Sequence, residues 1–235
     1  MFTKSAKFYD VIYASHLKNY ADEAKKTHDL IQKYKRSSGN ALLDVGCGTG
    51  LHIEYLKEYF DVKGLDLDPN ILEVASQRHP QANLYQADMA DFKIDHKFDV
   101  IVSLFSAIGY VKTLPRLKQT IRTMRDHLND GGVILVEPWF APDQFHDDKP
   151  HAVFVNEPDL KIARMNVSKV EGNVSILDFH YLVATSSGVE YFTEVHELGL
   201  FTVDEHLQAF RECGLKVVHD PEGIFGRGLY IGVRI

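Results

Sequence analysis

The sequence predicts an α/β fold in which a doubly wound, seven-stranded, mostly parallel sheet carries an inserted antiparallel β layer. First, the apolar residues 41–43 lead into a glycine-rich turn and then into helical spacing from Leu51, the opening βα unit of such a sheet. Second, apolar runs and helical patterns continue to alternate to about residue 140. Third, residues 142–200 contain runs rich in β-branched and aromatic residues, separated by hairpin signals.

Length and composition limit the class of protein. At 235 residues, the chain is expected to be one domain, residues 1–235, elaborated by residues 142–200. The net charge of −7 argues against a nucleic-acid or anionic-membrane surface. There is no apolar run of about 18 residues and no signal-peptide pattern at the start, so a soluble cytoplasmic protein is expected. Two isolated cysteines, Cys47 and Cys213, predict neither a disulfide framework nor a metal site.

The glycine-rich turn reads Asp44-Val45-Gly46-Cys47-Gly48-Thr49-Gly50. Because a glycine has no Cβ and tolerates a positive φ, backbone can come close to a ligand at each of these glycines. Dinucleotide enzymes use G-x-G-x-x-G, with a pyrophosphate at the helix N-terminus. Here Leu51 takes the place of the third dinucleotide glycine. The turn therefore disfavours a nicotinamide enzyme.

The charge at this turn favours a cationic ligand. Asp44 stands at the strand end, where its carboxylate would repel a pyrophosphate and attract a cation. S-adenosylmethionine fits that field because it carries an ammonium and a sulfonium and has no phosphate. The D-x-G-x-G-x-G pattern resembles that of class I S-adenosylmethionine-dependent methyltransferases, which implies that Asp44, Gly46 and Gly48 bind the cofactor.

The resemblance also implies that the N-terminal segment covers the cofactor. An amphipathic helix is expected over residues 20–35. Tyr9 and Tyr20 are accordingly predicted to bind the cofactor. Tyr13 is interpreted as a residue that packs this segment on the sheet, as large rings with a polar tip often do.

The second strand is expected over residues 61–66 and places Asp66 about 20 residues past the turn. An acidic side chain there meets the ribose in nucleotide-binding folds, since a carboxylate accepts both vicinal hydroxyls. Asp66 is predicted as the ribose ligand, with Leu67 beside it. Asp68 precedes Pro69 and is interpreted as the N-cap of a helix that runs to about His79.

Further ligand residues follow the next two strands. After a short strand at residues 83–86, Asp88 can accept a hydrogen bond from the adenine amine, while Met89 packs on the ring face. Residues 98–105 form the clearest buried strand. Ligands bind beyond the carboxyl ends of such strands, so Leu104 is expected beside the cofactor and Tyr110 near the methyl acceptor.

The remaining elements complete the sheet. Thr113 is expected to cap a helix that runs to Leu128, and a fifth strand is expected at residues 133–137. Thr202 and Glu205 form a capping box that opens a helix to Cys213. Final strands are expected at the ranges 216–219 and 229–234.

Two histidines and one arginine in the C-terminal half of the chain have side chains whose chemistry suits a functional site. His180 and His196 lie in the inserted layer and are interpreted as structural histidines. Arg227 stands between two glycines, where it is sterically free to hold an anion.

Several stretches resemble the N,N-dimethyltransferases that complete TDP-linked amino sugars such as desosamine and mycaminose. The matching stretches are 44–50, 88–92, 105–110, 136–139 and 226–229. The resemblance implies the following cofactor positions: Tyr9, Tyr20, Gly46, Asp66, Asp88, Met89 and Leu104. It also implies a substrate pocket that contains Tyr110 near the amine together with Trp139, Arg164 and Arg227.

The resulting hypothesis is methyl transfer from S-adenosylmethionine to the amino group of a nucleotide-linked amino sugar. Tyr110 would hold the amine and assist its deprotonation, although a tyrosine with a pKa of about 10 is a weak base. A homodimer is a further prediction. The alternatives are a methyltransferase for another small-molecule amine or hydroxyl, and a non-catalytic S-adenosylmethionine-binding protein.

Overall fold

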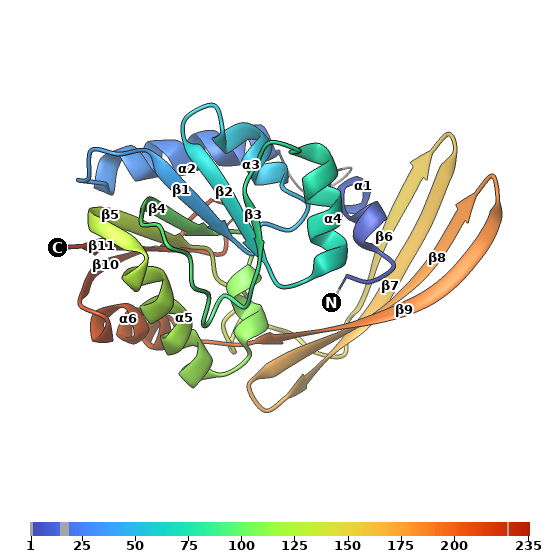
Figure 1. Cartoon of the computed structure of the whole chain (residues 1–235). Coiled ribbons are helices and arrows are strands. Elements are labelled where there is room, and N and C mark those ends of the chain that lie inside the picture. The colour runs from blue at the N-terminus through green and yellow to red at the C-terminus, as the bar shows by residue number, and fades with distance from the viewer. Residues whose placement is uncertain (1, 15–18, 225) are drawn as a thin grey trace.

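The computed structural model describes residues 2–14, 19–224 and 226–235, and it contains two β-sheets (Figure 1). The larger sheet has the strand order β10-β11-β5-β4-β1-β2-β3. Its strands are β1 (Ala41–Val45), β2 (Asp61–Asp66), β3 (Leu84–Gln86), β4 (Phe98–Ser103), β5 (Leu128–Val136), β10 (Leu215–Asp220) and β11 (Leu229–Arg234). β11 runs antiparallel to both of its neighbours, whereas the other pairs are parallel. The predicted fold class is confirmed.

Helices cover both faces of this sheet, as Figure 1 shows. The helices of the described chain are η1 (Ala6–Phe8), α1 (Tyr9–Ala14), α2 (Tyr20–Tyr34), α3 (Leu51–Leu56), α4 (Pro69–Arg78), η2 (Ala107–Val111), α5 (Leu114–Asp126) and α6 (Val203–Glu212). None of the described helices is long and apolar enough to cross a membrane.

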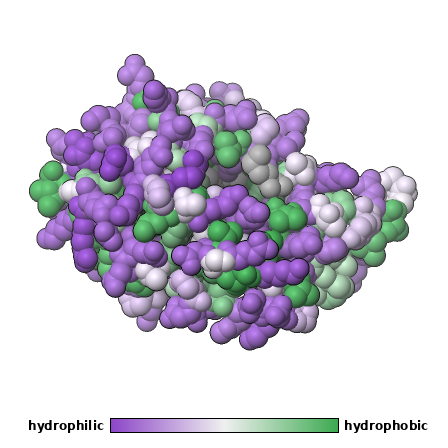
Figure 2. Space-filling model, turned by 90° about the horizontal axis from the view of Figure 1, so that it is seen from below, coloured by the Kyte–Doolittle hydropathy of each residue, from purple (hydrophilic) through white to green (hydrophobic). Residues whose placement is uncertain are grey.

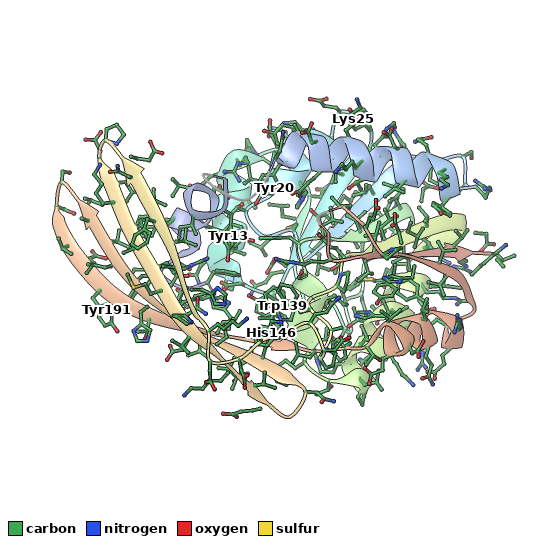
Figure 3. All side chains as sticks on the ribbon, turned by 180° about the vertical axis from the view of Figure 1, so that it is seen from behind. Tyr13, Tyr20, Lys25, Trp139, His146 and Tyr191 are labelled. Carbon is green, nitrogen blue, oxygen red and sulfur yellow. The ribbon has the colours of Figure 1, made fainter. Side chains whose placement is uncertain are left out.

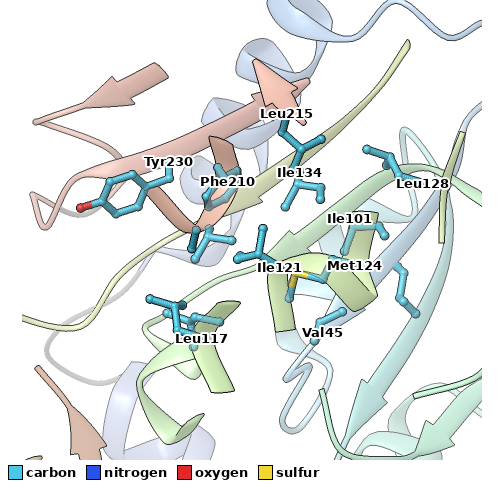
Figure 4. Close-up of a cluster of buried hydrophobic side chains, with 14 of the residues drawn as sticks. Val45, Ile101, Leu117, Ile121, Met124, Leu128, Ile134, Phe210, Leu215 and Tyr230 are labelled. Carbon is cyan, nitrogen blue, oxygen red and sulfur yellow. The ribbon is translucent and has the colours of Figure 1, made fainter. Parts of the chain in front are cut away.

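Alternating side chains divide the core of the sheet into two layers, since successive residues of a strand point to opposite faces. Leu43 packs under α5 and α6 with residues such as Ile121 and Phe210, the layer drawn in Figure 4. Its neighbour Leu42 packs on the other face, under α2 and α3, with Ile31 among others. Burial on both faces explains why β4 reads as a continuous apolar run.

The smaller sheet has four antiparallel strands in the order β6-β7-β8-β9 and lies between β5 and α6 in the chain. Its strands are β6 (Pro150–Glu157), β7 (Leu160–Glu171), β8 (Val174–Thr185) and β9 (Gly188–Gly199). Phe8 and Ile12 of the N-terminal segment pack against its inner face. This sheet projects beyond the larger one at the right of Figure 1.

Three boundaries differ from the sequence expectation. The helix that begins after Thr113 ends at Asp126, and β5 begins at Leu128, because the chain pairs with β4 before the two glycines at 131 and 132. Thr113 occupies the N-cap position, but within the described chain its side chain makes no capping hydrogen bond. The first inserted strand, β6, was not expected, because it is an edge strand that starts at a proline and is mostly exposed.

The capping box of α6 provides a stability prediction. Thr202 Oγ1 accepts a hydrogen bond from the Glu205 backbone N–H at 3.2 Å, and the Glu205 carboxylate accepts one from the Thr202 N–H at 2.8 Å. Thr202→Ala is expected to lower the free energy of unfolding by about 1 kcal/mol, measured by urea denaturation. Thr113→Ala is the matched control, and an equal loss in both variants would contradict this interpretation.

Candidate active site

A cavity of about 540 Å³ lies between the carboxyl ends of the parallel strands and the inner face of the small sheet. Ligand pockets in proteins are commonly of this size. Residues that follow β1, β2, β3, β4 and β5 all line it, and these include Gly46, Asp66, Asp88, Leu104 and Trp139. In Figure 3, Tyr13, Tyr20 and Trp139 lie around this region. We call it the central cavity.

The glycine turn forms one wall of the central cavity. Gly46 has φ +80° and Gly48 has φ +55°, conformations that glycine adopts without strain. A Cβ on Gly46 would lie 2.5 Å from the Cβ of Ala107. The Gly46 and Cys47 N–H groups both donate to the Leu65 carbonyl, at 2.7 and 3.0 Å. These hydrogen bonds fix the turn. Because its glycines have no Cβ, a ligand in the cavity can come close to its backbone.

Asp66 ends β2 at the edge of the cavity. Its carboxylate accepts hydrogen bonds from the N–H groups of Gly48 at 2.9 Å and Asp68 at 3.0 Å. Burial raises the pKa of Asp66, although these N–H groups act in the opposite direction. The two hydrogen bonds fix the orientation of the carboxylate beside the glycine turn. Asp68 itself caps α4 by accepting from the Asn70 N–H at 3.0 Å, as expected.

Asp88 follows β3 and has a partner that the sequence did not indicate. Arg116 of α5 donates to both of its carboxylate oxygens, at 2.8 and 2.6 Å. The Ala90 N–H also donates to Asp88, at 2.9 Å. These bonds hold the carboxylate in one orientation at the cavity wall, and Met89 lines the cavity beside it.

The N-terminal part of the chain contributes three tyrosines to the wall of the central cavity. Tyr9, Tyr13 and Tyr20 all line it, and the rings of Tyr9 and Tyr13 are 4.6 Å apart. Tyr13 thus does more than pack the segment on the sheet, because its hydroxyl accepts a hydrogen bond from Arg164 at 3.0 Å. The four-residue spacing from Tyr9 along α1 could have indicated this shared face.

The loop after β4 holds an unusual backbone. Phe105 and Ser106 have φ of +50° and +63°, which is costly for residues with a Cβ. Glu137 accepts a hydrogen bond from the Phe105 N–H at 2.6 Å, and the Ser106 hydroxyl donates to the Pro138 carbonyl at 2.6 Å. The loop leads directly into η2, which carries Tyr110. Strain maintained by such bonds is typical of a functional site.

Two arginines face the cavity, of which Arg164 is buried and Arg227 is half-buried. Arg164 has its guanidinium 4.5 Å from the ring centroid of Phe179. Arg227 donates to the Ser106 hydroxyl at 2.8 Å and lies 5.0 Å from the Trp139 ring. Burial lowers the pKa of Arg227. Aromatic faces stabilise both cations while the cavity side stays accessible to an anionic group.

The chain matches the family model described as a methyltransferase domain over residues 42–132. It is 40% identical, over 97% of both chains, to the dTDP-3-amino-3,4,6-trideoxy-alpha-D-glucopyranose N,N-dimethyltransferase of Streptomyces venezuelae. The chain belongs to the sugar N,N-dimethyltransferase family. The crystal structure of Streptomyces venezuelae DesVI is similar to it with a TM-score of 0.93, at 38% identity and 99% coverage of both chains.

A second solved relative bears on the cofactor of this chain. S-adenosylmethionine-bound CalS10, an amino pentose methyltransferase from Micromonospora echinaspora, is similar with a TM-score of 0.87, at 33% identity and 97% coverage of both chains. The enzyme is a methyltransferase that uses S-adenosylmethionine. The central cavity fits this cofactor, because the turn at Gly46 leaves space that a Cβ would fill and the carboxylate of Asp66 lies beside it.

All but one of the predicted site residues line the central cavity. They are Tyr9, Tyr20, Gly46, Gly48, Asp66, Leu67, Asp88, Met89, Leu104, Tyr110, Trp139, Arg164 and Arg227. Asp44 is the exception, since it is 1% exposed and lies outside the described lining. Its position at the end of β1 buries the side chain, so direct contact with the cofactor is not supported. Among the described residues, no cluster of His, Cys, Asp and Glu could hold a metal ion.

The principal residue that sequence reasoning missed is His196. It is buried and hydrogen-bonded, as interpreted from the sequence, with its Nδ1 2.7 Å from the Tyr110 hydroxyl, but its ring also lines the cavity, which the sequence did not indicate. His180, by contrast, is exposed and pairs with the Tyr191 hydroxyl. The alternation of β9 could have indicated the difference, because Glu194, His196 and Leu198 share the inner face.

Glu194 provides a pH prediction. Burial alone would raise its pKa, but the nearby His196 imidazole and hydrogen bonds from Ser5 and Lys4 lower the pKa from 4.5 to about 2. Because the pKa is lower in the folded state, this stabilisation is present above pH 4.5 and is lost as the pH falls towards 2. Glu194→Gln is expected to lower the melting temperature at neutral pH. The melting temperature of this variant should also fall less than that of the wild type between pH 4.5 and 2, as measured by thermal unfolding. The exposed Glu190 on the same strand is the control, and equal behaviour of the two variants would contradict the prediction.

Proposed function

We propose that this enzyme methylates the amino group of a TDP-linked amino sugar twice, giving the N,N-dimethylamine. The observation that carries the proposal is that two arginines, the buried Arg164 and the half-buried Arg227, face the same cavity as Tyr110. A guanidinium pairs well with phosphate oxygens, and a small neutral amine would need no such partner. The activities of the relatives, an N,N-dimethyltransferase of a dTDP-linked amino sugar and an amino pentose methyltransferase, support the same acceptor class.

Methyl transfer mainly requires that the amine be aligned with the methyl group of the donor. S-adenosylmethionine supplies a methyl group that its sulfonium already activates. The amine nitrogen forms the new N–C bond as the S–C bond breaks and its electron pair goes to sulfur. The ammonium that results then loses a proton to solvent before a second transfer. Tyr110 orients the amine, and the N-terminal tyrosines exclude water, contributions that are worth up to about 7–11 kcal/mol in well-oriented systems.

The acceptor class can be tested with paired substrates. We expect mass spectrometry to detect mono- and then dimethylated product from a TDP-linked amino sugar, with much less from the same sugar without its nucleotide. Methylation of free small amines at equal efficiency would favour the broader small-molecule methyltransferase. Binding of S-adenosylmethionine without transfer to any acceptor would favour a non-catalytic protein.

We further infer that residues 1–235 act as one domain and that the enzyme works in the cytoplasm as a homodimer. Support for the dimer comes from a cross-strand row of apolar residues on the outer face of the small sheet, where Phe154, Leu182 and Tyr191 are 56%, 50% and 62% exposed. Tyr191 is labelled on this outer side in Figure 3, and hydrophobic atoms gather on the projecting sheet at the right of Figure 2. Light scattering tests this, and a monomeric mass would contradict it.

A further inference from the structure

Tyr110 is coupled to a buried histidine from a distant part of the chain. Its hydroxyl lies 2.7 Å from Nδ1 of His196 on β9. His196 is 1% exposed, and its ring lies 4.5 Å from that of Phe2 and 5.3 Å from that of Phe179. The hydrogen bond therefore lies in an apolar enclosure at the edge of the central cavity, where water competes poorly for either partner.

A carboxylate stands on the other side of this histidine. Glu194 Oε2 lies 3.8 Å from His196 Nε2. Its Oε1 accepts from the Thr3 hydroxyl at 3.1 Å and from the N–H groups of Lys4 and Ser5 at 2.7 and 3.1 Å. The Ser5 hydroxyl donates to Oε2. A carboxylate with this many donors stays ionised, so its charge favours a proton on Nε2.

The position of that proton sets the direction of the hydrogen bond. A neutral imidazole carries one N–H and one bare nitrogen, so a proton on Nε2 leaves Nδ1 as an acceptor. Burial lowers the pKa of His196, and the nearby Arg164 of β7 acts in the same direction, whereas Glu194 opposes them. With a neutral His196 in this tautomer, the Tyr110 hydroxyl must donate its proton to Nδ1.

We propose that His196, oriented by Glu194, is a positioning residue that makes Tyr110 a hydrogen-bond acceptor towards the substrate amine. The inference rests on the proposed function. The Tyr110 oxygen then presents its lone pairs to the cavity, so the amine donates an N–H to it and keeps its own lone pair for attack on the methyl group. A tyrosine hydroxyl without His196 could instead donate to the amine and occupy the lone pair that has to react.

This arrangement also accounts for an end point at two methyl groups. A primary amine and its monomethyl product both carry an N–H that Tyr110 can accept. The dimethylated amine, as a free base, carries none and loses this contact. The tertiary amine is therefore not held for a third transfer.

The experiment compares His196→Phe, His196→Asn, Tyr110→Phe and the Tyr110→Phe/His196→Phe double variant. A phenyl ring fits between Phe2 and Phe179, and an asparagine oxygen can still accept from Tyr110. We expect His196→Phe to lower kcat about tenfold with little change in the KM for S-adenosylmethionine. We expect His196→Asn to recover part of kcat, and the double variant to be no slower than Tyr110→Phe. His28→Phe, on α2 and stacked on Tyr59, is the matched control.

Two outcomes would overturn the inference while leaving the proposed function intact. One is a kcat of His196→Phe that lies within twofold of the kcat of an active wild type. The other is independent, multiplicative losses in the double variant.

Nitrogen-15 NMR of the wild-type imidazole provides a readout that does not depend on turnover. A proton on Nε2 with bare Nδ1 at pH 7 is expected, and the opposite tautomer or an imidazolium would also overturn the inference. A wild type inactive on every amino sugar counts against the proposed function, and the NMR result still decides the hydrogen-bond direction.

Discussion

Gly46→Ala is expected to weaken S-adenosylmethionine binding by a factor of about a hundred or more. At φ +80° an alanine is strained by roughly 1–2 kcal/mol. Its Cβ would also overlap that of Ala107, at 2.5 Å, at the wall of the central cavity. Relieving such an overlap typically costs about 1–3 kcal/mol more and would shift the turn or the start of η2. Titration calorimetry with S-adenosylmethionine and its demethylated product measures the loss.

Gly172→Ala is the matched control for this prediction. Gly172 also has a positive φ, +60°, but a Cβ there would meet nothing described within 4 Å. Both variants thus carry backbone strain, and only Gly46→Ala disturbs the cavity. Thermal unfolding checks that both variants fold. Unchanged affinity in a folded Gly46→Ala protein would contradict the placement of the cofactor on the glycine turn.

Arg227→Gln is expected to raise the KM for a TDP-linked amino sugar about tenfold or more. A hydrogen bond to a charged group contributes about 1.5–3 kcal/mol, and a neutral amide cannot replace the ionic part. The KM for S-adenosylmethionine should stay the same, since Arg227 lies with Trp139 and Ser106 on the acceptor side. Arg227→Lys should recover part of the affinity because it keeps the charge but loses the fork geometry. Steady-state kinetics with each substrate varied in turn gives the comparison.

The control for Arg227 is Arg125→Gln, which removes an exposed arginine that pairs with Asp126 on the surface. It should leave both KM values unchanged. A second comparison uses the free amino sugar, for which Arg227→Gln should have little effect. If the KM for the nucleotide-linked and the free sugar rose equally, Arg227 would not be a phosphate contact.

Much of the fold could be predicted because local signals and tertiary packing agree. The strand β2 has the expected bounds, since its apolar run ends at the turn that Asp68 and Pro69 initiate. The predictions failed where pairing with a neighbour overrides local composition. β5 continues through a glycine pair that looks like a turn, because it pairs with β4 on either side of the glycines, at Leu128 and at Val133. β6 has little apolar alternation, because it is an edge.

The location of residues at the central cavity was predictable where they stand next to a motif or at a strand end, as Gly46 and Asp66 do. Contacts between distant segments left no local signal. The Arg116–Asp88 pair joins residues 28 apart, and the Tyr110–His196 hydrogen bond joins residues 86 apart. Asp44 illustrates the opposite case, because a motif position pointed to the ligand and the fold buried the side chain.

The most direct measurement of the central claim is a time course with S-adenosylmethionine and a TDP-linked amino sugar. Mass spectrometry should follow the acceptor while the release of S-adenosylhomocysteine is measured in the same samples. We predict that the acceptor gains one and then two methyl groups, with one S-adenosylhomocysteine released for each. No release, or release without any change in the mass of the acceptor, would contradict the proposed transfer to an amino sugar.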